Sequence, residues 1–109
     1  MPPITLTAPL ETDAEDRRTA DGQYVLLVRL ALPAGAKGRP IVVRATKRYG
    51  SGPAAAIACR SRSRQLRRGV LVTLSGDGLS WMRGVAELHE VHDLQAPDLT
   101  TPMHGAVER

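Results

Sequence analysis

The stretch "SGPAAAIACRSRSRQLRRGVLVTLSG", residues 51–76, changes its pattern once, and that change decides the fold. Pro53 can open a helix, because proline is tolerated at the first helical position, and Gly69 supplies a C-terminal stop. Residues 54–68, which lie between Pro53 and Gly69, carry helix formers. From Val70 to Gly76, apolar and polar residues alternate, as in a half-buried strand. The sequence therefore predicts one helix followed directly by a strand.

Strand patterns lie on both sides of this helix. The stretches with the composition or alternation of strands are residues 4–10, 23–32 and 41–50 before the helix, and 70–76 and 85–94 after it. The segments between them are rich in turn residues and are expected to be connections: 11–22, 33–40 and 77–84. In the strand over 41–50, the period of two places Arg44 and Arg48 on one face and Lys47 and Tyr49 on the other.

Three strands, one helix and two strands match an all-β architecture. It is the five-stranded Greek-key barrel called the OB-fold, with the α-helix between strands 3 and 4. We expect this domain to span residues 1–95. Residues 96–109 contain two prolines and little periodicity, so we expect a loosely ordered C-terminal tail.

Composition sets the broad class of the protein. The 109 residues suffice for one domain, and the 3% of aromatic residues include no phenylalanine, which predicts an aliphatic core. The single cysteine, Cys59, cannot form an intramolecular disulfide, which fits a reducing compartment. The sequence contains neither a secretory signal nor a stretch of about 20 apolar residues that could span a bilayer. We therefore expect a soluble, cytoplasmic protein with no membrane association.

Charge is distributed unevenly along the chain. The net charge is +4, but no Asp or Glu occurs between Gly22 and Gly76. The cations of that segment are Arg29, Lys37, Arg39, Arg44, Lys47, Arg48, Arg60, Arg62, Arg64, Arg67 and Arg68. A basic middle with acids confined to its flanks indicates a polyanionic partner, most often nucleic acid.

Three stretches resemble one protein family, in the right order and spacing. They are "LETDAEDRRTADGQYVLLVRLAL" (10–32), "RYG" (48–50) and "QLRRGVLVTLSGDGLSW" (65–81). They are similar to the first hairpin, the aromatic–glycine pair closing the third strand, and the helix end with the fourth strand of the single-stranded DNA-binding proteins of bacteria, phages and plasmids. Ala14 replaces the usual proline, and the chain ends "HGAVER" instead of in an acidic tail. These departures favour a divergent member from a phage, plasmid or mobile element.

The resemblance implies a non-enzymatic OB-fold protein that coats exposed single strands during DNA replication, recombination or transfer. It also implies a homo-oligomer, dimer or tetramer. Binding would occur in a basic groove with limited aromatic stacking, and RNA would use the same groove. The alternative hypothesis is an OB-fold assembly module, such as a primosome-like accessory or structural component, whose basic face docks an acidic protein.

Single-strand binders combine cations that follow the phosphates with aromatic rings that stack on bases. The nucleic-acid-binding candidates are Lys37, Arg39, Arg44, Lys47, Arg48, Tyr49, Trp81 and Arg83. Tyr24 begins a buried strand and is expected to be structural. For the five arginines between Arg60 and Arg68, we favour a solvated helix face or pairing with the acids of residues 11–21. If the bound nucleic-acid strand followed a longer path around the protein, these arginines would contact it.

No pattern in the sequence indicates catalysis. His89 and His92 would point to opposite sides of a strand, and no cysteine pair or third ligand stands at metal-site spacing. Ser75 and Ser80 lack the context of a catalytic triad. We therefore expect no catalytic residues, metal, cofactor or small-molecule substrate.

Overall fold

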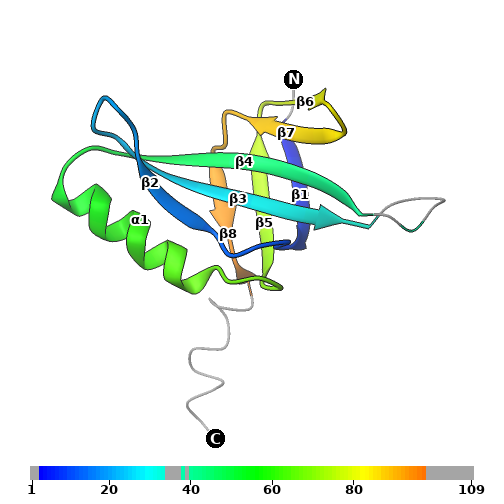
Figure 1. Ribbon diagram of the computed structural model, residues 1–109, viewed down its shortest axis with the longest axis horizontal. Coiled ribbons are helices and arrows are strands. Elements are labelled where there is room, and N and C mark those ends of the chain that lie inside the picture. The colour runs from blue at the N-terminus through cyan, green and yellow to red at the C-terminus, as the bar shows by residue number, and fades with distance from the viewer. Residues whose placement is uncertain (1–2, 34–37, 39, 98–109) are drawn as a thin grey trace, which may run out of the picture.

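The computed structural model describes residues 3–33, 38 and 40–97 (Figure 1). Two predicted site residues, Lys37 and Arg39, lie outside the described residues, as does the predicted tail from residue 98 onward. The elements are β1 (Ile4–Pro9), β2 (Glu15–Arg18), β3 (Tyr24–Leu32), β4 (Ile41–Gly50), α1 (Pro53–Gln65), β5 (Leu71–Gly76), β6 (Gly78–Met82), β7 (Val85–His89) and β8 (Asp93–Gln95).

Two sheets form the body of the molecule. One has the strand order β1-β5-β8, and the other has the order β2-β3-β4-β7-β6. All pairings are antiparallel except β4 with β7, which run parallel. The chain first passes from one sheet to the other between β1 and β2, and we call this segment, residues 10–14, the first crossing. An isolated bridge between Leu10 and Leu30 ties it to β3.

Three stretches of the described chain pass from one sheet into the other and are divided into two strands each. When each such pair is counted as one strand, the eight described strands correspond to the five predicted ones. The first strand of the OB-fold is β1 with β2, the fourth is β5 with β6, and the last is β7 with β8. The second and third strands are β3 and β4. The pairing then follows the OB-fold scheme, in which the third strand lies parallel to the fifth. The predicted fold class is confirmed, and Figure 1 shows the two sheets wrapped around a common interior.

Three predictions about strands and connections were wrong, and all concern segments with exposed residues. Segment 11–22, expected to be a connection, contains β2, and segment 77–84 contains β6. Both are edge strands of the five-stranded sheet, and most of their residues are exposed. An edge strand gains hydrogen bonds from its neighbour without burying a face, so it carries no apolar alternation. The strand expected over 85–94 is interrupted, with Glu90 at a φ of 53°.

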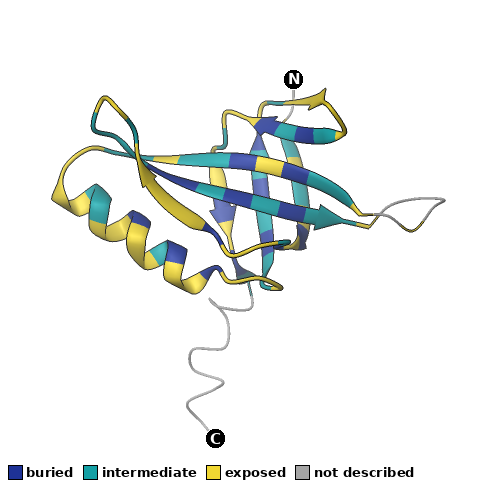
Figure 2. Ribbon diagram, viewed as in Figure 1, coloured by how far each residue is buried: buried dark blue, intermediate teal, exposed yellow. Residues whose placement is uncertain are grey.

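The core is aliphatic, as the composition predicted. Its largest fully buried side chains are Leu26, Leu30, Leu66, Leu74, Val43, Val72 and Cys59. They come from β3, β4, β5, α1 and the turn after it, and Figure 2 shows the buried positions alternating along the strands. Burial of this apolar surface is the main favourable term in the folding of the domain.

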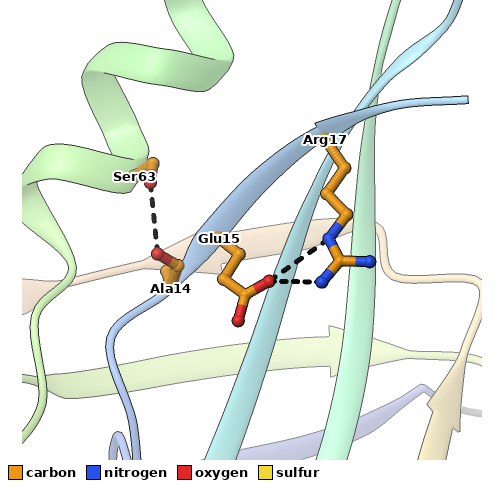
Figure 3. A network of polar contacts seen from close by, with 4 residues as sticks. All are labelled: Ala14, Glu15, Arg17 and Ser63. Atoms are coloured by element: carbon orange, nitrogen blue, oxygen red, sulfur yellow. Dashed lines mark hydrogen bonds and ion pairs between the residues drawn. The ribbon is translucent and has the colours of Figure 1, made fainter.

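Helix α1 is attached to the first crossing. Its buried residues are Cys59 and Ser63, and it contacts β2, β3 and β4. The Ser63 hydroxyl donates a hydrogen bond to the Ala14 carbonyl at 3.2 Å (Figure 3), and the Ala14 N–H donates to the Leu66 carbonyl at 2.9 Å. The helix ends at Gln65, earlier than the expected Arg68. None of the helical segments in the described residues has the length and hydropathy of a membrane span.

Candidate nucleic-acid interface

The outer face of the five-stranded sheet carries two of the three cations predicted on the third strand, Arg44 and Arg48. Along β4, Val43 and Ala45 are buried, while Arg44 and Arg48 are exposed on the opposite face. Thr46 lies between these two arginines on the same face and is half-buried. The alternation predicted from the sequence therefore holds in the structure.

A groove of about 360 Å³ runs across this outer face. Its lining comes from four strands and the first crossing: Thr12, Asp13, Glu15, Arg17, Leu27, Val28, Arg29, Arg44, Ala45, Thr46 and Glu87. A second hollow of about 260 Å³ shares Thr46 and Glu87 and continues towards Arg48 and His89. We call the two hollows together the outer groove.

Acidic side chains accompany most arginines of the outer groove. Arg17 pairs with Glu15 at 2.7 Å, as Figure 3 shows. Arg29 pairs with Glu11 at 3.0 Å, and Arg44 with Glu87 at 3.5 Å. The groove is therefore closer to neutral than the sequence of its central strands implied. Each partner is substantially exposed, and such pairs contribute at most about 1 kcal/mol, so a phosphate group can replace the carboxylate at low cost.

Arg48 differs from its neighbours in the groove. Within the described part of the chain, it forms no ion pair with a carboxylate. It lies near the β2–β3 turn, where the pKa of Asp21 is lowered chiefly by a hydrogen bond from the Thr19 hydroxyl and to a smaller extent by the charge of Arg48. Among the described residues, Arg48 is therefore the groove arginine without a carboxylate within ion-pair distance.

The predicted stacking residue Trp81 lies on the other side of the sheet. Trp81 is paired with Ala86, which is buried, whereas Ser80 is paired with Glu87 of the groove. Because paired residues share a face, Trp81 is on the face opposite Arg44. It is 59% exposed, since β6 is the edge strand. Arg83 follows in the turn, with a φ of 54°.

Lys47 and Tyr49 also lie on the inward-facing side of β4, near its C-terminal end and at the margin of the core. The Lys47 ammonium lies 5.6 Å from the centroid of the Tyr49 ring, within the range of a cation–π contact. Tyr49 packs against the core, and burial raises its pKa. Tyr24 packs against the core as well, as expected for a structural residue. Of the predicted candidates, the structure brings only Arg44 and Arg48 together in the groove among the residues that it describes.

The histidines take part in local hydrogen bonds. Ser80 Oγ lies 2.7 Å from His89 Nε2, and His92 Nε2 lies 2.5 Å from Asp77 Oδ1. The residues that the structure describes include no group of three or more His, Cys, Asp or Glu side chains suited to a metal. These histidines therefore help to hold the bend between β7 and β8, next to the groove.

Sequence reasoning missed several groove residues. Arg17 and Glu15 escaped because β2 was not recognised as a strand. Arg29 and Leu27 share a face of β3, and alternation within that strand could have indicated them. Glu87 enters the groove through the parallel pairing with Arg44, a relationship that no local pattern encodes.

The strand pairing and the outer groove together define an OB-fold protein. No protein-family model and no curated protein matches the sequence. Among solved structures, a deletion variant of the single-stranded DNA binding protein from Thermus aquaticus is similar with a TM-score of 0.56 and 21% identity over 89% of this chain. This chain spans 41% of the Thermus chain. The second single-stranded DNA binding protein of Mycobacterium smegmatis is similar with a TM-score of 0.54 and 21% identity, covering 91% of this chain and 90% of the other.

Proposed function

We propose that this protein binds single-stranded DNA in the outer groove, without catalysing a reaction. The observation that carries the proposal is the position of the groove. OB-folds bind oligonucleotides on the face of their second and third strands, between the loops that join strands 1–2 and 4–5. Here that face belongs to β3 and β4, and it holds Arg29, Arg44 and Arg48. The two solved structures named above, whose proteins bind single-stranded DNA by name, support the same assignment.

The residues of the groove favour binding without sequence preference. Arginine is suited to phosphate, because its planar guanidinium presents paired donors. The described lining of the outer groove contains no tyrosine or tryptophan. Affinity should therefore come mainly from phosphate contacts, which position a strand but do not read its bases. Such binding suits a protein that coats exposed strands during replication, recombination or transfer.

We also propose that the protein self-associates through β6. Four large hydrophobic residues are exposed in the described part of the chain, and three of them, Leu79, Trp81 and Met82, lie on this strand. β6 is also one of the two edge strands of the five-stranded sheet. An exposed apolar edge strand favours pairing with a second copy. In this assembly, Trp81 would be buried at the contact between copies.

The proposed function is tested by the salt dependence of binding. A labelled oligothymidine should bind with an affinity that falls as salt rises, because phosphate contacts release counterions. In the Arg44→Gln/Arg48→Gln protein, the plot of the logarithm of the association constant against the logarithm of salt concentration should become less steep by about 1.4. This is about 0.7 for each lost phosphate contact on single strands. The Arg44→Lys/Arg48→Lys protein, which keeps both charges, should retain most of the slope. Absence of binding at micromolar protein, or a slope that no groove substitution changes, would reject the proposal.

A further inference from the structure

Among the described residues, arginines without an acidic partner gather on helix α1 and the turn after it. The helix contains no acidic residue. Among the described residues, the guanidinium groups of Arg60, Arg64 and Arg68 form no ion pair, and that of Arg67 pairs with Asp13 at 2.6 Å. The outer groove shows the opposite arrangement, since three of its arginines are paired with carboxylates.

These arginines lie on an open surface. The helix buries Cys59 and Ser63, and the helical period places Ser61 on the opposite side, with Arg60 and Arg64 on the exposed flank between the two. A shallow hollow of about 580 Å³ lies there, lined by Ala56, Ile57, Arg60, Ser61, Arg64 and Gln65. Arg60 and Arg64 are one turn apart, about 6 Å along the helix axis. We call Arg60, Arg64, Arg67 and Arg68 the α1 arginine surface.

Asp13 connects this surface to the outer groove. Its side chain lines the groove, and it also accepts hydrogen bonds from the Arg67 guanidinium at 2.6 Å and from the backbone N–H of Arg68 at 2.7 Å. One end of the groove and the C-terminal end of α1 therefore meet at a single residue. A strand leaving the groove past Asp13 encounters Arg67 and Arg68 first, and then Arg64 and Arg60 along the helix.

We infer that the α1 arginine surface is a second phosphate-binding site, which continues the path of a long single strand beyond the outer groove. This inference rests on the proposed function. Two observations favour a nucleic acid over an acidic peptide. The surface is continuous with the groove, and all its cations are arginines, the side chain best matched to phosphate. Ile57, 69% exposed beside Arg60, offers the strand an apolar contact.

The test compares two oligothymidines with the Arg60→Gln/Arg64→Gln protein. One oligomer of about 8 nucleotides lies within the range that a single OB-fold covers, and one of about 30 exceeds it. For the long oligomer, the double substitution should lower the salt slope by about 1.4, at about 0.7 per lost phosphate contact. For the short oligomer, affinity and slope should equal those of the unsubstituted protein. The Arg60→Lys/Arg64→Lys protein should restore most of the slope, and circular dichroism should show the same fold in all three proteins.

The outcomes separate this inference from the proposed function. If the unsubstituted protein binds neither oligomer, the proposed function fails. If it binds both, and the Arg60→Gln/Arg64→Gln protein keeps the full slope on the long oligomer, the inference about α1 is overturned while the groove remains. Polyglutamate serves as the probe for an acidic protein partner. Loss of polyglutamate binding with an unchanged slope on DNA would assign the α1 arginine surface to a protein and overturn the inference.

Discussion

Arg44 and Glu87 are paired across the parallel strands β4 and β7, and their side chains form an ion pair of 3.5 Å in the middle of the outer groove. Both side chains are about half exposed. A carboxylate thus occupies the place where a phosphate would be bound. The proposed ligand must displace Glu87 from Arg44, and the cost of that exchange sets part of the affinity.

Removing this carboxylate should strengthen binding. Glu87→Gln is expected to raise the affinity for oligothymidine about two- to fivefold, because an exposed pair is worth up to about 1 kcal/mol and the groove also loses a repulsive charge. Fluorescence anisotropy at low salt measures the change. Asp93→Asn makes the same change of charge on β8, away from the groove, and should have a smaller effect. Equal affinities of the two variants would show that Glu87 does not compete with the ligand.

Trp81 should contribute to self-association more than to strand binding. In Trp81→Ala, the dissociation constant for self-association should rise at least about tenfold, since a large apolar side chain is lost from the free sheet edge. Sedimentation velocity over a range of concentrations measures it. Affinity for a short oligothymidine should change less than about twofold.

The opposite result would assign Trp81 to the ligand. Base stacking on an aromatic ring contributes about 1–3 kcal/mol, so a loss of affinity of about fivefold or more with unchanged sedimentation would place a base on Trp81. Its fluorescence gives a second readout, because the protein has a single tryptophan. Quenching by oligothymidine without a change in association would support that same conclusion.

Gly76 is a position where the fold admits no side chain. A Cβ atom there would lie 2.6 Å from the His89 carbonyl oxygen and 2.8 Å from Leu88 Cγ. Gly76→Ala should therefore lower the free energy of unfolding by about 3 kcal/mol, the cost of overpacking at a buried site. Gly78→Ala is the matched control, since a Cβ atom at that position would meet nothing within 4 Å. Urea denaturation should show the control within about 0.5 kcal/mol of the unsubstituted protein.

Tyr49 should make stability depend on pH in alkali. Its pKa in the folded protein is raised above 10.0, mainly because burial disfavours the phenolate. The unfolded chain therefore loses this proton at a lower pH than the folded protein. The stabilising contribution is fully present below pH 10.0 and is lost as the pH rises through the folded pKa. Tyr49→Phe should weaken the loss of stability in this range, measured by urea denaturation at several pH values. An identical pH profile for both proteins would contradict the assignment.

Much of the fold could be predicted from the sequence because buried strands and capped helices leave local patterns. Alternation identified β1, β4 and β5, and the apolar run at residues 23–32 identified β3. Pro53 and Gly69 bracketed the helix and its terminal turn. β2 and β6 escaped because their backbones are satisfied by a neighbouring strand while their side chains remain exposed. Edge strands of this kind follow from pairing, which local sequence does not report.

The amino-acid sequence by itself determined the order of the buried strands and the helix, the aliphatic core and the concentration of positive charge between Gly22 and Gly76. Only the tertiary structure decided which of these cations have an acidic partner. Strand pairing brings Glu87 onto Arg44, and the first crossing brings Glu11 onto Arg29, so two arginines of the outer groove gain partners from the acidic flanks. The arginines of α1, in contrast, form no ion pair among the described residues. The physical reason is distance. Ion pairing acts over a few ångströms, and the partners of Arg29 and Arg44 stand 18 and 43 residues away in the chain, so only the tertiary fold brings them together.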